Sequence, residues 1–440
     1  MSDGVHRQAA DTEAVLSREC IIALLERMPD VTAIDATPDR RNSVMNTAVR
    51  CVRQGRRTVA VGTDSKTQIG GLLDLVDLQL HGADARDGTP VAPDEVTFLL
   101  ATDEWDTEAE GAVRTLAAQL DAGFRVGLHR LTSRGEVLPI SAAGLDDLGD
   151  HRKYRYTDWL DLLKRVEDQP PPLVQRLLAS VPREELRAYP VLGSKNGWAL
   201  RLEGLEVAQV GPDRGWADVG ADYDGRRGPE RSTWLETAPE GRLAIADGDG
   251  SVDAAAAAIN RFADAWAEVL NRSGKHNEHA LESRVLRGLV PVETSSGELQ
   301  LLRGADGARV NWGSQFPTRW GRTTARGARY LDALLRDGQT PWALELKVEG
   351  SQSVGYYYRH AVAQAVLYRH FLRSATHLAP WFEDLNLDHT ACRAAVVVPT
   401  FRSEHQKWRD RLLEVCGVFD VELVEVSERY ARAGAVEPAA

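Results

Sequence analysis

Two apolar runs, YLDALL at residues 330–335 and ALELKV at residues 343–348, flank an Asp-Gly turn. An Asp-Gly turn between apolar runs is a strong hairpin signal, so the sequence predicts two antiparallel strands here. Charged residues interrupt both runs: Asp332 in the first, and Glu345 and Lys347 in the second. Burying a lone carboxylate is costly, so these charges are expected to have partners.

The spacing of the three charges predicts that they meet. Glu345 and Lys347 are two positions apart and therefore lie on the same face of their strand. Asp332 can reach that face from the paired strand. Two carboxylates and an ammonium at one edge of a sheet predict a site for a hard cation such as Mg²⁺, for which Mn²⁺ can substitute. A Mg²⁺ ion held there activates water for phosphodiester cleavage.

The Glu-x-Lys pattern is uncommon in this chain, which has only seven lysines. A similar Asp-x-Lys at residues 64–66 lies just beyond a predicted strand of the N-terminal region and lacks a hairpin partner. The competing interpretation of Asp332, Glu345 and Lys347 is a structural ion-pair cluster in a mixed sheet.

Helices and strands are expected to alternate around this hairpin in the order α-β-β-β-α-β-α-β. The predicted elements are a helix at 276–289, strands at 299–303, 329–335 and 342–348, a helix at 356–373, a strand at 392–399, a helix at 403–415 and a strand at 419–426.

The pattern of Asp332 followed by Glu-Leu-Lys at 345–347 resembles the PD-(D/E)xK nuclease superfamily, the fold of many restriction endonucleases. The resemblance covers residues 274–428, about a third of the chain, and implies a restriction-endonuclease-like αβββαβ core. Leu331 stands where the superfamily's name has proline.

Further residues fit the same resemblance. Gln364 and Tyr368 form the QxxxY motif of the RecB-like branch, and their i,i+4 spacing places them on one helical face. Glu282 lies in the preceding helix, where many members have an additional acid. The alternatives are ordinary helix residues for the first two and a solvated acid for Glu282. His276 and His279 are interpreted as surface residues at the start of that helix.

The resemblance also implies roles for these residues. Asp332, Glu345 and the Leu346 carbonyl would bind Mg²⁺. Lys347 would orient or help deprotonate the attacking water and stabilise charge on phosphorus. Glu282 would bind a second metal ion or a metal-bound water.

The loop before the hairpin combines arginines with aromatic residues and glycine, which suits phosphate contacts and base stacking. An ordinary surface loop has the same composition. The predicted nucleic-acid-binding residues are Arg319, Trp320, Arg322, Arg326, Arg329, Tyr356 and Arg359.

The rest of the chain is predicted to form two further regions of an α/β protein. Residues 1–148 alternate strands and helices, which predicts an α/β domain with a largely parallel sheet and no assigned chemistry. Residues 149–273 are a mixed connector, with a hairpin at 198–210 and a loop-heavy stretch at 211–250. Residues 429–440 are expected to be a disordered tail.

The net charge of −12 argues against a nucleic-acid partner, but its distribution argues for one. Residues 272–380 carry +6, which leaves −18 for the rest of the chain. A basic island in an acidic protein suits a phosphate-binding face, although a solvated patch would look the same. No apolar run is long enough to cross a membrane, and the N-terminus lacks the apolar core of a secretory signal.

The sequence therefore predicts a Mg²⁺-dependent nuclease that acts on nucleic acid, with DNA preferred on family grounds, in repair or in defence against foreign DNA. Four widely separated cysteines fit a reducing cytoplasm and argue against a zinc site. The N-terminal region would bind a regulatory protein partner or a second copy of the chain. The alternative is a catalytically inactive nuclease fold that binds nucleic acid or acts as a scaffold.

Overall fold

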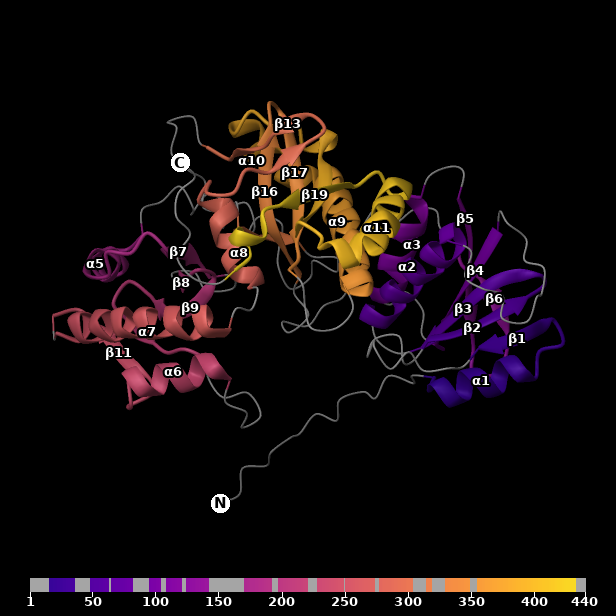
Figure 1. The fold of residues 1–440 in the computed structure, drawn as a ribbon, viewed down its shortest axis with the longest axis horizontal. Coiled ribbons are helices and arrows are strands. Elements are labelled where there is room, and N and C mark those ends of the chain that lie inside the picture. Colours follow the sequence, from indigo (N-terminus) through magenta and orange to yellow (C-terminus); the bar gives the residue numbers. More distant parts are fainter. Residues whose placement is uncertain are drawn as a thin grey trace, which may run out of the picture.

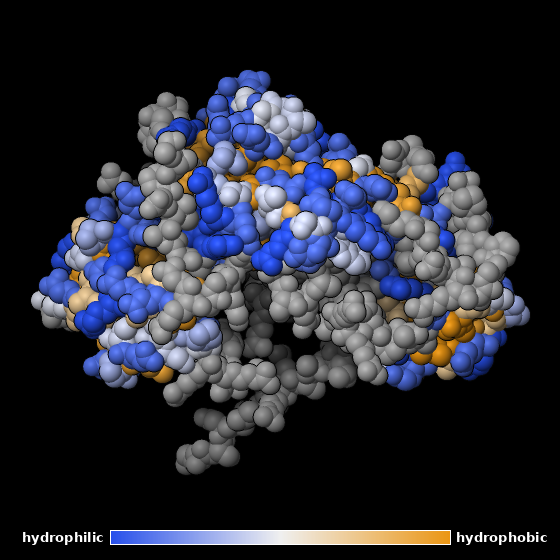
Figure 2. Space-filling model, in the orientation of Figure 1, coloured by the Kyte–Doolittle hydropathy of each residue, from blue (hydrophilic) through white to orange (hydrophobic). Residues whose placement is uncertain are grey.

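Three large β-sheets with their covering helices, and one small two-stranded sheet, give the described part of the chain a mixed α/β fold (Figure 1). The computed structural model describes residues 16–35, 48–62, 65–81, 95–103, 108–120, 124–141, 170–191, 197–220, 228–248, 250–273, 277–303, 314–318, 329–348 and 354–432. None of the helices in these ranges has both the length and the apolar character of a membrane span. Among the residues that Figure 2 colours by hydropathy, hydrophilic ones predominate on this face and hydrophobic ones form smaller patches.

The first sheet has six strands that lie side by side in sequence order. They are β1 (Val31–Asp35), β2 (Ala48–Arg53), β3 (Arg56–Gly62), β4 (Glu95–Ala101), β5 (Arg125–Leu131) and β6 (Val137–Pro139). Helices α2 (Ser65–His81) and α3 (Glu108–Ala118) pack on one face, and α1 (Arg18–Glu26) packs on the other.

The prediction of a largely parallel first sheet is wrong, because only β3, β4 and β5 run parallel. The remaining neighbours are antiparallel. Strands β2 and β3 form a hairpin through Gln54 and Gly55, whose φ angles are 51° and 73°. Two successive positive φ angles are the geometry of a type I′ turn, for which Asn-Gly is the usual signal. Glutamine at the first position hid this turn in the sequence.

The second sheet is antiparallel throughout, in the order β11-β10-β9-β8-β7. Its strands are β7 (Leu186–Pro190), β8 (Trp198–Leu202), β9 (Leu205–Val210), β10 (Arg214–Ala217) and β11 (Leu243–Ala246). Its core is completed by helices α5 (Pro172–Ser180), α6 (Pro229–Thr237) and α7 (Ser251–Ser273).

The hairpin predicted at residues 198–210 is confirmed as β8 and β9. The prediction of a loop-heavy stretch at 211–250 is wrong in part, because β10, α6 and β11 lie within it. Both strands have only four residues, too few to show a clear alternation. Helix α6 begins with Pro229 in its first turn, a position where proline is favoured.

The third sheet has the order β14-β16-β17-β18-β19, with β15 also paired to β16. Its strands are β14 (Gln300–Leu301), β15 (Ser314–Thr318), β16 (Arg329–Asp337), β17 (Thr340–Leu346), β18 (Arg393–Pro399) and β19 (Glu422–Val426). The associated helices are α8 (Glu278–Leu286), α9 (Val354–Ser374), α10 (Ala379–Asp384) and α11 (Gln406–Val418). A small hairpin follows α8. Its two strands, β12 (Glu293–Thr294) and β13 (Gly297–Glu298), have two residues each.

Strand β16 is antiparallel to its neighbours, whereas β17, β18 and β19 run parallel. The predicted helices and strands occur in the predicted order, but they are interrupted by elements that were not predicted: β12 and β13 after α8, β15 inside the arginine-rich loop, and α10 after α9. Tyr430 and Ala431, which the sequence assigned to a disordered tail, are buried.

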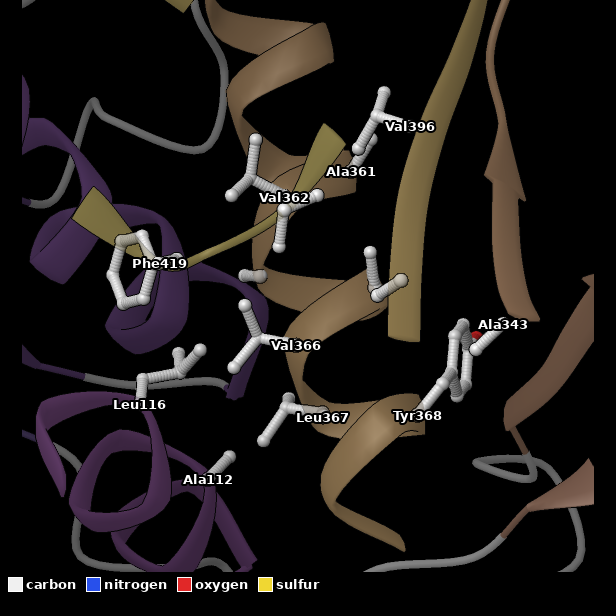
Figure 3. Packing of buried hydrophobic residues seen from close by; sticks show 14 of the residues in the cluster. Ala112, Leu116, Ala343, Ala361, Val362, Val366, Leu367, Tyr368, Val396 and Phe419 are labelled. Atoms are coloured by element: carbon white, nitrogen blue, oxygen red, sulfur yellow. The ribbon is translucent and has the colours of Figure 1, made fainter. Parts of the chain in front are cut away.

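One hydrophobic core joins the first sheet to the third. Leu116 of α3 faces α9, whose Val366 and Leu367 belong to the same core (Figure 3). Beside this core, Arg411 of α11 donates two hydrogen bonds to the buried Asp77 carboxylate of α2, at 2.5 and 3.2 Å. Helix α9 therefore lies between the third sheet and the N-terminal helices.

Candidate active site

The alternation of β17 side chains between two helices positions the candidate site. Leu344 and Leu346 belong to the core shared with α8, whereas Ala343 belongs to the core shared with α9. Glu345 follows Ala343 by two residues and therefore points to the α9 side. Figure 3 shows Ala343 beside the ring of Tyr368, which comes from α9.

Asp332 of β16 comes to the same place through the hairpin. Ala333 pairs with Leu344, so Asp332 stands one position further along, opposite Glu345. The Asp332 Oδ2 atom accepts a hydrogen bond of 2.8 Å from the backbone N–H of Leu346. The two acids that the sequence singled out thus lie on adjacent strands and on one face of the sheet.

The ammonium group of Lys347 connects the acidic residues. Its Nζ atom lies 2.6 Å from Glu345 Oε1, 3.9 Å from Asp332 Oδ2 and 3.0 Å from Glu278 Oε1. It also donates a hydrogen bond of 2.9 Å to the carbonyl oxygen of Leu346. The Lys347 and Glu345 side chains are almost fully buried, whereas Asp332 is 19% and Glu278 28% exposed. The cluster therefore meets solvent mainly at Asp332 and Glu278.

Negative charge accumulates in this cluster. Burial raises the pKa of Asp332 well above its usual value, and the carboxylates of Glu345, Glu282 and Glu278 raise it further. Lys347 acts in the opposite direction but does not cancel these effects. A site with more carboxylates than ammonium groups favours the binding of a cation.

Helix α8 contributes two acids, one of which the sequence analysis missed. The Asn277 side chain accepts hydrogen bonds from the His279 and Ala280 backbone N–H groups and so caps the helix, which places Glu278 in its first turn. Glu278 and Glu282 are four positions apart and therefore lie on one helical face. That spacing was visible in the sequence and could have identified Glu278.

Glu282 lies in the site region and is not a solvated helix acid, because its side chain is only 6% exposed. Its Oε2 atom is 3.7 Å from Nδ1 of His279, which is exposed. A hydrogen bond to Glu282 raises the pKa of His279 against the opposing effect of burial. The charge of Glu282 also raises the pKa of Asp332.

Gln364 and Tyr368 approach the acidic cluster from α9. The Gln364 amide donates a 3.4 Å hydrogen bond to the Tyr368 hydroxyl, and Tyr368 is buried. Burial raises the pKa of Tyr368 well above its usual value, and the charges of Glu345 and Asp332 add to the rise. The QxxxY pair therefore covers the acids on the side opposite α8.

The oxygen atoms at this site are of the kind that Mg²⁺ takes. Asp332 and Glu345 supply carboxylates and Leu346 a carbonyl, and Mg²⁺ is usually held by one or two carboxylates with waters and substrate phosphates. Within the described ranges, no group of three or more His, Cys, Asp or Glu side chains could hold a metal ion. The donor atoms at the site are therefore of the right chemical type for Mg²⁺. Only two of them come from side chains, Asp332 and Glu345, so water or substrate oxygens would have to complete the coordination.

The predicted nucleic-acid-binding residues fall largely outside the described residues. Arg319, Trp320, Arg322 and Arg326 lie outside them altogether. Arg329 begins β16, and Tyr356 and Arg359 lie in the first two turns of α9, but only their backbone is described.

Comparisons of the chain with models of protein families, with curated proteins and with solved structures found no match.

Proposed function

We propose that this protein is a metal-dependent nuclease that hydrolyses phosphodiester bonds, with Mg²⁺ as its ion and Mn²⁺ as a substitute. The proposal rests on one observation: a buried ammonium, Lys347, lies 2.6 Å from Glu345 and 3.9 Å from Asp332 at the end of β17. Two carboxylates, a carbonyl and a lysine at one open edge are the groups that metal-assisted hydrolysis needs.

The arrangement assigns a role to each group. Asp332, Glu345 and the Leu346 carbonyl would hold the ion. When bound, Mg²⁺ lowers the pKa of a coordinated water and offsets charge on the phosphoryl oxygens. Lys347 would orient the attacking water and stabilise the negative charge that develops on phosphorus. The water oxygen forms a new P–O bond and gives up a proton to solvent, while the P–O bond to a sugar oxygen breaks and that oxygen takes up a proton from solvent. Glu282 would hold a second ion or a coordinated water.

The order of elements supports placing residues 274–428 in the PD-(D/E)xK superfamily with a restriction-endonuclease-like core. Helix α8 precedes the β16–β17 hairpin, and α9 then connects β17 to the parallel strand β18. Gln364 and Tyr368 on α9 agree with the RecB-like branch, because they are hydrogen-bonded to each other and Tyr368 packs beside Ala343 of β17, on the sheet face that carries Glu345.

The substrate we propose is nucleic acid, with DNA preferred, and the role is repair or defence against foreign DNA in the cytoplasm. The basic balance of residues 272–380 supports an anionic substrate, since the rest of the chain is acidic. The first two sheets would then serve substrate recognition or regulation.

A catalytically inactive, nucleic-acid-binding form of the same fold is the second candidate. The contact between Lys347 and Glu345 favours it, because a carboxylate whose charge is already balanced by an ammonium group has less need of a metal ion. The lack of a third side-chain ligand among the described residues points the same way.

Cleavage assays distinguish the two candidates. Labelled single- and double-stranded DNA and RNA would be incubated with the full chain in Mg²⁺, in Mn²⁺ and in EDTA. We expect metal-dependent cleavage that Lys347→Ala lowers by about a hundredfold or more, as the loss of a group acting on the reacting water does.

The matched control is Lys407→Ala, which removes an exposed lysine from α11 and should leave the rate unchanged. No cleavage of any substrate in either metal would overturn the proposal in favour of the inactive form. Cleavage that persists in EDTA, or that Lys347→Ala leaves intact, would also overturn it.

A further inference from the structure

The second sheet has one face without a helix among the described residues. Its apolar side chains Leu200, Ala208 and Ile245 point to the side where α5, α6 and α7 complete the core. The alternate residues point the other way and form what we call the open face. Its principal side chains are Arg187, Tyr189, Arg201, Gln209, Arg214 and Trp216.

Aromatic rings stand at two positions across this face. The strand pairing Tyr189–Ala199–Gln209–Trp216 runs straight across β7, β8, β9 and β10. Three strand spacings separate the two rings by about 14 Å. Trp216 is 37% exposed and is one of two exposed large hydrophobic residues in the described part of the chain, the other being Leu413 of α11. A single exposed hydrophobic residue is common on protein surfaces, but Trp216 stands on β10, next to the edge strand β11, and shares its face with a second ring and several arginines.

Each ring has an arginine beside it. The Arg242 guanidinium lies 5.1 Å from the centre of the Trp216 ring, and that of Arg201 lies 5.9 Å from the centre of the Tyr189 ring. Arg242 also contacts Asp218 at 3.1 Å but remains 60% exposed. These pairs combine a flat apolar surface with positive charge.

Further charges make the face basic. Arg214 is exposed and Arg187 is half-buried. Two acids lie beside the arginines: Glu206, which stands opposite Arg201, and Asp218, which contacts Arg242. The Glu206 carboxylate accepts a hydrogen bond of 2.6 Å from Gln209, and Arg187 donates one of 3.1 Å to the backbone carbonyl of Leu186. The face therefore complements a polyanion that carries flat rings.

This face continues towards the candidate active site. The turn after β8 touches the start of α8 so closely that a Cβ atom on Gly204 would lie 2.6 Å from the Cβ atom of His279. The charge of Arg201 acts on the same histidine, whose Nδ1 atom is 3.7 Å from Glu282. An extended ligand bound along β8 would therefore reach the start of α8, the helix that carries Glu278 and Glu282.

We propose that the open face binds single-stranded nucleic acid, with bases stacked on Tyr189 and Trp216 and phosphates held by the neighbouring arginines. Aromatic rings on an open sheet, with Trp216 exposed and Tyr189 half-buried, can stack only unpaired bases, since a duplex keeps its bases inside. This inference rests on the proposed nuclease function, for which it specifies an unpaired strand as the substrate.

Binding is measured separately from cleavage, by fluorescence anisotropy in EDTA with the full chain. The probes are a labelled oligo(dT) of about 15 nucleotides and a duplex of the same length, a range typical of single-strand binders. We expect the oligo(dT) to bind more tightly than the duplex. Trp216→Ala and Tyr189→Ala should each weaken oligo(dT) binding about tenfold, as the loss of one stacked base does.

Two matched controls separate the open face from general effects. Leu413→Ala removes the other exposed large hydrophobic side chain and should not change binding. Arg242→Gln should weaken binding and reduce its salt dependence. Arg176→Gln, which removes a 49% exposed arginine of α5 paired with Asp247, should do neither.

Unchanged oligo(dT) affinity in both aromatic variants would overturn the inference, even if Mg²⁺-dependent cleavage were found. Loss of dimers in the Trp216→Ala variant, with unchanged oligo(dT) binding, would assign the face to contacts between copies of the chain and overturn it too. Binding that depends on both rings, in a chain that cleaves nothing in either metal, would support the inference while removing the proposed activity.

Discussion

Glu203, in the turn between β8 and β9, accepts two hydrogen bonds from Arg284, the fully buried arginine of α8. The Oε2–Nη2 distance is 2.9 Å and the Oε1–Nε distance is 3.3 Å. Arg284 also donates to the backbone carbonyl of Tyr430 at 2.8 Å. Because α8 carries two acids of the candidate site, the second sheet and the C-terminal segment together fix where those acids lie.

Removing the Glu203 carboxylate should loosen α8. Glu203→Ala leaves the Arg284 charge buried without its carboxylate, which costs about 3 kcal/mol in a buried pair. We expect faster hydrogen exchange at the α8 amides and a lower melting temperature. Glu184→Ala, which removes a 91% exposed carboxylate 3.9 Å from Arg287, is the control and should change neither. Equal hydrogen-exchange protection of the α8 amides in both variants would contradict the conclusion that the contact between Glu203 and Arg284 holds α8 in place.

Glu203→Gln should be milder than Glu203→Ala. Burial raises the pKa of the Glu203 carboxyl, and Arg284 and Arg287 lower it only in part. Burial therefore costs the ionised side chain more than its ion pairs return, and a neutral amide oxygen avoids that cost while still accepting a hydrogen bond. Thermal melting of the two variants side by side checks the order.

Metal binding and cleavage should separate in the site variants. Asp332→Asn and Glu345→Gln remove ligand charge and should weaken Mn²⁺ binding, measured by the loss of the free-ion signal in electron paramagnetic resonance. Lys347→Ala removes the competing ammonium, so Mn²⁺ binding should be retained or tightened while cleavage is lost. Weaker binding in Lys347→Ala than in Asp332→Asn would show that the lysine supports the ion indirectly.

Glu278 should matter through its contact with Lys347. Because the Glu278 carboxylate is 3.0 Å from the ammonium, Glu278→Gln frees Lys347 to move and should lower cleavage by about tenfold, as the misplacement of a catalytic group does. Glu293→Gln changes an exposed acid of β12 and should leave the rate unchanged. Equal rates in the two variants would remove Glu278 from the site.

The first and third sheets should depend on Asp77. Its side chain is 3% exposed and pairs with Arg411, so Asp77→Ala should destabilise this junction by about 3 kcal/mol. Faster proteolysis between the N-terminal helices and α11 would be the readout. Asp410→Ala, an exposed acid on the same helix as Arg411, serves as the control. If both variants resist protease alike, the ion pair does not hold the junction.

The hairpin of the candidate site could be predicted because its signals are local. An Asp-Gly turn fixed the pairing of β16 with β17, and a two-residue spacing fixed the shared face of Glu345 and Lys347. The same kind of spacing, between Glu278 and Glu282, was present but was not used. Where the sequence had such a local signal, the structure agrees with it.

Contacts between segments that are far apart in the sequence could not be predicted, because no local pattern marks them. Asp77 and Arg411 are 334 positions apart, and neither stands in a motif that names the other. Glu203 reads in sequence as an ordinary turn acid, although the turn inserts it against α8. The open face could not be predicted from the sequence either. The strand register shifts between Leu200 and Arg201, so the side chains of β9 do not alternate regularly between the two faces of the sheet.

The sharing of α9 between two layers limits how this chain can be shortened. Ala112 and Leu116 of α3 cover the side of α9 that faces away from the sheet (Figure 3). A fragment starting at about residue 149 would keep every acid of the hairpin yet expose Val366 and Leu367 to water. Such a truncation would aggregate on expression unless those positions were made polar, so biochemical work on the candidate site requires that the first sheet and its helices be kept.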